Sequence, residues 1–345
     1  MSFARRTSAL IVATSLAVAV GAPPAVAAWN NRARAESAVG YIASQQKRDG
    51  SIPAFSPIGS TADAVVSMAA AGLGKDQVRK ALNYLRRQTE RGNVLSVGLQ
   101  AKVVLAAVAG GRNPRNFGGI NLVTGISGTE RPDGRYGVNT AVFDQALAML
   151  AIEAAGGNPS GNARQWLVDA QCDDGGWQYD EPASADDDQH CEDNVDPGND
   201  FFQSDTNTTA YAVMALEAGA GAQPGTDPLG FFGAIRDGQF GGWGYTWAFK
   251  TTDANSTSLA IQAYAASAEP LPAGTFQALK NLQYGRRCGA FAFTWVNNGQ
   301  GGFKRSGPDT GATIGGVLGL LKRRLPVLEK KNLLIIVRPT IVCPG

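Results

Sequence analysis

A pair of helix-like segments recurs six times along the chain, and this repeat limits the architecture more than any other feature. In each pair the first segment ends in a glycine-rich, often aromatic turn, and the second is rich in alanine and poor in charge. We expect the first segments at residues 32–46, 76–88, 118–125, 161–171, 227–235 and 275–283. The second segments are expected at residues 62–71, 96–109, 140–155, 207–218, 255–266 and 311–321.

The two kinds of segment differ in the surroundings that they suit. A helix that is apolar nearly all round belongs inside a structure, whereas a helix with one charged face can lie against water. A repeat of about 45 to 50 residues with two helices is typical of a solenoid or a closed ring of hairpins. Because the first and last repeats carry no obvious polar caps, we predict a closed, all-α fold, an α6/α6 toroid, over residues 29–322.

The N-terminus has the three parts of a secretory signal peptide. Arg5 and Arg6 precede an apolar run at residues 9–22, and small residues follow at 25–28. We predict a signal peptide at residues 1–28 with cleavage near Ala27 or Ala28, and a secreted or cell-surface protein. No later stretch is long enough to cross a membrane.

Residues 323–345 break the repeat, and we expect them to form a C-terminal tail. We expect the protein to be a monomer.

Four cysteines in an exported chain predict disulfide bonds. Cys172 and Cys191 flank one acidic insertion and form the first expected pair, while Cys288 and Cys343 form the second. Other pairings stay open from sequence alone.

Charge argues against nucleic acid as a partner. The chain has 31 basic and 29 acidic side chains, and no basic stripe is interleaved with aromatic residues.

The acidic insertion at residues 173–205 is a candidate calcium site. Asp193, Asp196 and Asp200 lie in its best candidate run for calcium, which takes several oxygen ligands. The spacing does not match the twelve-residue calcium loop, so a solvated acidic loop is the alternative. No other cofactor is expected.

The turns carry a recognisable motif. Residues 171–177 read Gln-Cys-Asp-Asp-Gly-Gly-Trp, and residues 239–243 read Gln-Phe-Gly-Gly-Trp. This pattern resembles the QW repeat of squalene-hopene cyclases and of the wider prenyltransferase and squalene oxidase repeat family. Glycine permits the left-handed backbone that ends a helix, and glutamine can bond freed carbonyl groups. The motif therefore predicts fold rather than function.

The starts of the last three inner helices test the resemblance further. They read Asp-Thr-Asn-Thr-Thr-Ala from Asp205, Asp-Ala-Asn-Ser-Thr-Ser from Asp253 and Asp-Thr-Gly-Ala-Thr from Asp309. The resemblance to class II terpene cyclases implies Asp-x-Asp-Asp-Thr-Ala, whose middle aspartate protonates an alkene. Asn207 and Asn255 stand at that position here, and an amide has no proton acidic enough for this step. These polar residues are therefore expected to cap helices and to face a central cavity.

Aromatic residues gather in the turns that lead to the inner helices. Trp177 and Trp243 are expected to fasten neighbouring hairpins. Tyr245, Trp247, Phe293 and Trp295 follow the fasteners, so together with Asn207 and Asn255 they are candidate ligand-binding residues.

Three functions are compatible with these features. The first is an exported toroid that binds a small apolar or ring-shaped ligand. The second is an enzyme, either a divergent terpene cyclase or a carbohydrate-processing toroid, with Asp205, Asp253, Asp309 and Asp144 as candidate catalytic carboxylates. The third is a structural cell-surface protein with a ligand-indifferent cavity.

Overall fold

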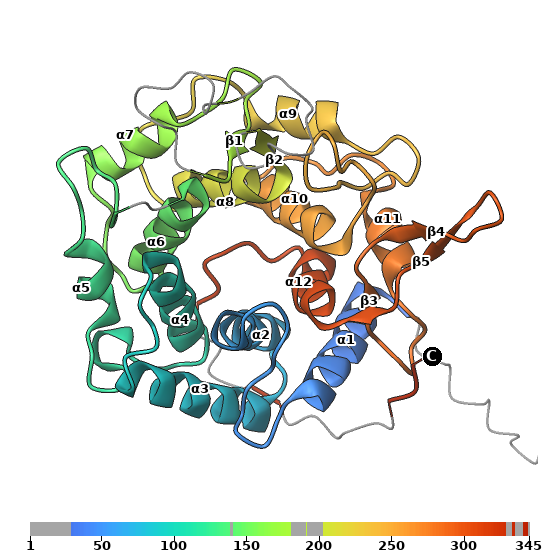
Figure 1. Cartoon of the computed structure of the whole chain (residues 1–345), viewed down its shortest axis with the longest axis horizontal. Coiled ribbons are helices and arrows are strands. Elements are labelled where there is room, and N and C mark those ends of the chain that lie inside the picture. The colour runs from blue at the N-terminus through green and yellow to red at the C-terminus, as the bar shows by residue number, and fades with distance from the viewer. Residues whose placement is uncertain are drawn as a thin grey trace, which may run out of the picture.

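A computed structural model describes residues 29–138, 141–180, 191, 203–328, 333–334 and 341–343 of the chain. In this part, helices form two concentric rings around a central space (Figure 1). The predicted α6/α6 toroid is confirmed. The predicted signal peptide lies outside the described residues.

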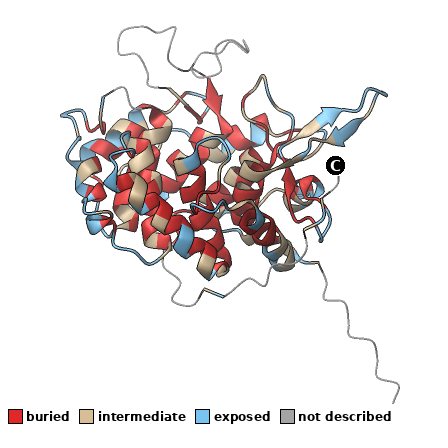
Figure 2. Cartoon of the chain, turned by 60° about the horizontal axis from the view of Figure 1, so that its bottom comes forward, coloured by how far each residue is buried: buried red, intermediate tan, exposed pale blue. Residues whose placement is uncertain are grey.

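The inner ring contains the charge-poor helices of the repeat. They are α2 (Pro57–Ala71), α4 (Val97–Ala109), α6 (Val142–Ala154), α8 (Thr206–Glu217), α10 (Ala254–Ala266) and α12 (Thr310–Leu321). Each inner helix packs against the next, and α12 packs against α2, so the ring is closed. Most of their residues are buried (Figure 2), as expected for helices that are apolar nearly all round.

The outer ring carries the polar faces. Its helices are α1 (Asn31–Gln45), α3 (Lys75–Glu90), α5 (Leu122–Ser127), α7 (Gly161–Asp169), α9 (Pro228–Ile235) and α11 (Thr275–Leu282). The third outer helix differs most from its predicted bounds, because a 3-10 turn, η1 (Pro114–Asn116), and the Phe117–Ile120 bridge precede it. Among the inner helices, α2 begins five residues before the predicted start, because Ser56 caps it and Pro57 fits its first turn.

Three turn glutamines join neighbouring hairpins. Each donates its side-chain N–H groups to a carbonyl of its own turn and to a carbonyl beside the next outer helix. The bonds run from Gln46 to Gly50 and Gln77, from Gln171 to Gly175 and Thr226, and from Gln283 to Gly289 and Arg34. Because Gln283 reaches α1, the last of these closes the outer ring. Arg236 makes the equivalent bonds in the fifth turn, to Gly241 and Ala273.

The turn tryptophans are fully buried. The Trp177 indole N–H donates to the Leu167 carbonyl at 2.7 Å, and that of Trp243 donates to the Phe232 carbonyl at 2.7 Å. Each indole ring therefore packs onto the outer helix of its own hairpin. These two side chains stabilise the fold rather than bind a ligand.

Short antiparallel strands shape the turn face. β1 (Trp177–Gln178) pairs with β2 (Ser204–Asp205), and β3 (Phe291–Ala292) pairs with β6 (Pro308–Asp309). β4 (Trp295–Asn297) and β5 (Phe303–Arg305) form a hairpin that projects from the ring (Figures 1 and 2).

The predicted disulfides are both present, Cys172–Cys191 and Cys288–Cys343.

The segment after α12 crosses the end of the ring that lies opposite the turns with the short strands. There Leu325 is buried, and its N–H approaches the Met214 sulfur at 3.4 Å. Farther along, Leu334 pairs with Leu73 in the turn between α2 and α3. The first part of the predicted tail thus closes the base of the ring.

No helix in the described ranges is long and apolar enough to cross a membrane.

Candidate functional site

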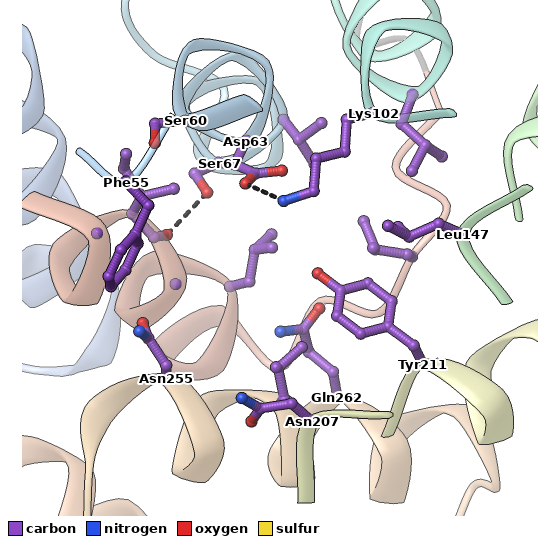
Figure 3. Close-up of a pocket in the computed structure, with 18 of the residues that line it drawn as sticks. Phe55, Ser60, Asp63, Ser67, Lys102, Leu147, Asn207, Tyr211, Asn255 and Gln262 are labelled. Carbon is purple, nitrogen blue, oxygen red and sulfur yellow. Dashed lines mark hydrogen bonds and ion pairs between the residues drawn. The ribbon is translucent and has the colours of Figure 1, made fainter. Parts of the chain in front are cut away.

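A cavity of about 200 Å³ occupies the centre of the ring. All six inner helices contribute to its wall, and Leu325 forms part of its floor. Most of the lining is apolar, including Leu105, Leu147 and Ile314. The polar lining groups lie at two places, shown in Figure 3.

An ion pair between α2 and α4 forms one polar wall. Lys102 Nζ lies 2.8 Å from Asp63 Oδ2. Burial is the largest influence and lowers the pKa of Lys102, but the charge and hydrogen bond of Asp63, together with the nearby Tyr211 and Asp144, outweigh it, so the pKa is raised above its usual value. Lys102 is therefore a cation at all physiological pH values, and Asp63 largely neutralises it.

Side chains from α8 and α10 form the opposite polar wall. Asn207, Tyr211 and Gln262 point toward the central space in Figure 3. Burial raises the pKa of Tyr211 to about 12, so its hydroxyl stays protonated. Gln262 is 1% exposed, and its amide nitrogen donates to the Ser258 carbonyl at 3.2 Å. That bond assigns the other amide atom as oxygen, because only N–H can donate to a carbonyl.

The Gln262 side-chain oxygen has no hydrogen-bond partner among the described residues, and neither has the Asn207 side-chain oxygen. Buried polar atoms are nearly always paired, since a lost hydrogen bond costs about 1–3 kcal/mol. The α8–α10 wall thus presents two acceptors without a partner among the described residues, and it suits a ligand group that donates hydrogen bonds.

A second pocket of about 560 Å³ lies at the turn face above this cavity. Phe55, Asn207 and Asn255 line both spaces, so the pocket is the mouth of the cavity. Five of its twelve lining residues are aromatic, and Phe55 is 84% exposed at the entrance.

The structure divides the predicted aromatic residues. Tyr245, Phe293 and Trp295 line the mouth. Trp247 lines neither space: its ring packs edge-on against Phe231 with centroids 6.5 Å apart.

Three of the four predicted carboxylates cap helices, and none of the four lines the central cavity. Asp205 accepts the Asn207 and Thr208 backbone N–H groups at 2.8 Å, and Asp253 accepts that of Ser256 at 2.7 Å. Asp309 caps α12 in the same way. This geometry satisfies the first N–H groups of each helix, as N-cap residues do.

Two of these capping aspartates have a raised pKa. Burial raises the pKa of Asp205 and of Asp253 to about 7, although hydrogen bonds to the helix N–H groups oppose the shift. Asp253 also lines the mouth, whereas Asp205 is fully buried. Asp144 lies on α6 beside α4, where burial raises its pKa and Lys102 opposes the change.

The calcium candidates Asp193, Asp196 and Asp200 lie outside the described residues. Within the described part, no group of three or more His, Cys, Asp or Glu side chains is arranged to hold a metal ion.

Sequence reasoning selected Asn207 and Asn255, which line the cavity, but missed the other polar residues of its two walls, Asp63, Lys102, Tyr211 and Gln262. Asp63 and Lys102 are isolated charges within the otherwise apolar α2 and α4. Because a charge on a helix that is buried all round needs a partner, this isolation was a usable signal. Gln262 gave no comparable signal, since its orientation depends on the packing of α10.

Comparisons with known proteins agree on the fold. No protein-family model matches the chain, and no curated protein is significantly similar in sequence. A type II terpene cyclase from Scytonema, in complex with geranylgeranyl dihydroxybenzoate, superposes with a TM-score of 0.55 and 13% identity, covering 85% of this chain and 97% of that chain.

Carbohydrate-active enzymes share the architecture as well. An inactive variant of an alpha-1,6-mannanase from Salegentibacter, in complex with alpha-1,6-mannotriose, gives a TM-score of 0.52 at 11% identity, covering 85% of this chain and 99% of that chain. An unsaturated glucuronyl hydrolase specific for heparin gives 0.54 at 10% identity, with 85% and 96% covered. At such identities the likeness shows the α/α toroid and no shared activity.

Proposed function

We propose that this protein is an exported binding protein that holds a small amphipathic ligand in the centre of its ring. The observation that carries the proposal is the Gln262 side-chain oxygen, which has no partner among the residues that the structure describes. Gln262 is 1% exposed and lies in the wall of a cavity whose remaining lining is mainly apolar. The ligand would place an apolar or ring-shaped body against the leucines. It would donate a hydroxyl or N–H hydrogen bond to Gln262, where a buried acceptor otherwise stays unsatisfied.

Cavity size limits the ligand. An apolar cavity of about 150 Å³ holds benzene. The central space of about 200 Å³ therefore fits one substituted ring, and the mouth of about 560 Å³ can take a further part. The aromatic side chains Tyr245, Phe293 and Trp295 would contact that outer part.

The arrangement of acids favours binding over the chemistry of the structural neighbours. Glycoside hydrolysis ordinarily needs two carboxyl groups that flank the substrate. Asp63 is the one carboxylate among the described residues that line the central cavity, and it is paired with Lys102. Alkene protonation needs a strong acid at the position that Asn207 and Asn255 occupy.

A carbohydrate-processing enzyme is the second candidate, and one observation favours it. Asp253 lines the mouth, and its pKa of about 7 suits a general acid at neutral pH. Asp253→Asn that abolishes turnover of a carbohydrate, while the fold is retained, would support this function instead.

Native mass spectrometry tests the main proposal. The mature protein is purified from its own culture medium and measured before and after denaturation, and a releasable organic mass is expected. Gln262→Leu removes the acceptor at similar volume, so we expect it to lose this mass and to unfold at an equal or higher temperature, because an unsatisfied polar atom is gone. Gln277→Leu, on the exposed face of α11, is the matched control. Full ligand occupancy in Gln262→Leu, or no releasable mass in the wild type, contradicts the proposal.

A further inference from the structure

A second recess lies on the outside of the ring, where α1, α11 and the β4–β5 hairpin meet (Figure 1). Its volume is about 490 Å³. Four of its lining residues are cationic and none is acidic. The complete lining is Trp29, Arg34, Lys280, Asn281, Gln283, Trp295, Lys304 and Arg305. We call this feature the basic recess.

Two arginines in the basic recess are held in fixed positions. Arg34 lies over the Trp29 ring, with 3.7 Å from its guanidinium carbon to the ring centroid, and it donates to the Gln283 side-chain oxygen at 3.2 Å. Arg305 lies 4.4 Å from the Tyr284 ring centroid and donates to the Gln283 carbonyl at 2.6 Å. Each guanidinium has five N–H donors, so both keep donors for another partner. Their orientation is therefore set before any ligand arrives.

The cations of the recess lack the carboxylate partners that several arginines elsewhere have. Arg32 pairs with Glu36, Arg86 with Glu90 and Arg164 with Glu153. In contrast, Arg34, Lys280, Lys304 and Arg305 have no carboxylate partner within the described part of the chain. Burial lowers the pKa of Arg34, as expected for a cation without a counter-charge.

Two further donors of the recess are unpaired. The indole N–H groups of Trp29 and Trp295 are buried and find no acceptor among the residues that the structure describes. Both rings line the recess. An indole N–H can only donate, so both groups need a hydrogen-bond acceptor.

We propose that the basic recess is a binding site for an oxyanion group, a sulfate, phosphate or carboxylate carried by an extracellular ligand. Oxyanions accept several hydrogen bonds at once, and guanidinium groups match their geometry. The site is separate from the central cavity, because of its lining residues only Trp295 also faces the mouth. It does not depend on the ligand proposed for the cavity.

The test uses inorganic sulfate, inorganic phosphate and citrate in separate calorimetric titrations of the mature protein at constant ionic strength. We expect saturable binding of at least one of them, and the tightest binder identifies the kind of anionic group. Lys280→Gln with Lys304→Gln removes the two cations that make no hydrogen bond to Gln283. We expect about tenfold weaker binding from the loss of two surface charge contacts.

Lys75→Gln with Lys80→Gln is the matched control, because it removes the same net charge from exposed positions on α3. It is expected to bind like the wild type. An equal loss of affinity in this control would show that net charge alone acts, and the absence of saturable binding to all three anions would overturn the site. Gln262→Leu should leave anion binding unchanged, so the cavity proposal and this one can fail independently.

Discussion

Asp253→Asn should make the protein more stable at neutral and alkaline pH. The Asp253 carboxylate is 4% exposed and begins α10, where its two oxygens accept the N–H and the hydroxyl of Ser256, each at 2.7 Å. Asparagine retains the capping oxygen. Its amide nitrogen can donate to the Ser256 hydroxyl, which is able to accept as well as donate.

The magnitude follows from the pKa of Asp253, which burial raises from 3.8 to about 7 on folding. Below pH 3.8 the group is protonated in both states and contributes no pH dependence. As pH rises toward 7, the unfolded chain releases this proton while the folded chain retains it, so the folded state loses stability. The loss is complete above pH 7 and amounts to about 4 kcal/mol, at about 1.4 kcal/mol for each pKa unit.

The assay is urea unfolding, followed by far-ultraviolet circular dichroism with the disulfides intact, at pH 4 and pH 8. We expect wild type and Asp253→Asn to be similar at pH 4, and the variant to be more stable by up to about 4 kcal/mol at pH 8. The pKa of Asp205 is raised equally, so the variant should retain about half of the pH dependence from this pair. Asp309→Asn, at a half-buried cap, is the matched control and should change stability by about 0.5 kcal/mol or less. An unchanged pH dependence in Asp253→Asn would refute the reasoning.

Two further variants test the packing. Trp247→Ala should lower the free energy of unfolding in urea by about 2 kcal/mol, because its contact with Phe231 is lost. Ligand occupancy in native mass spectrometry should stay unchanged. A loss of occupancy without a loss of stability would show that Trp247 contacts the ligand. Gly50→Ala should cost about 3 kcal/mol, because φ is 96° and an added Cβ would lie 2.3 Å from the Lys80 carbonyl oxygen. Gly72→Ala has φ of 70° and open space, so it should show only the backbone term of about 1 kcal/mol, and equal costs at the two glycines would contradict the clash.

The two-ring fold could be predicted because the charge pattern of each helix, which assigns it to a ring, can be read from a short stretch of sequence. An apolar helix such as α4 and an amphipathic helix such as α3 differ in charge pattern, and that difference alone assigns each to a ring. The short α5 was placed less well, because the Phe117–Ile120 bridge, which follows η1, extends into the expected span and is fixed by turn geometry.

The candidate site was less accessible to sequence reasoning, because its features depend on side-chain direction. Trp247 and Trp295 follow equivalent turn motifs, yet one packs on Phe231 and the other lines the mouth. The unsatisfied oxygen of Gln262 arises because its amide nitrogen is held by Ser258 on the same helix. Neither outcome follows from residue type or spacing.

The positions of the acids also favour an anion site outside the ring over one at its centre. Helix N-termini attract anions through their free N–H groups and the positive end of the helix dipole. In α8, α10 and α12 the first N–H groups are already bonded to Asp205, Asp253 and Asp309. In the cavity below, Asp63 neutralises Lys102. A neutral hydrogen-bond donor therefore suits the centre of the ring. The cations of the basic recess, which have no carboxylate partner among the described residues, suit an oxyanion.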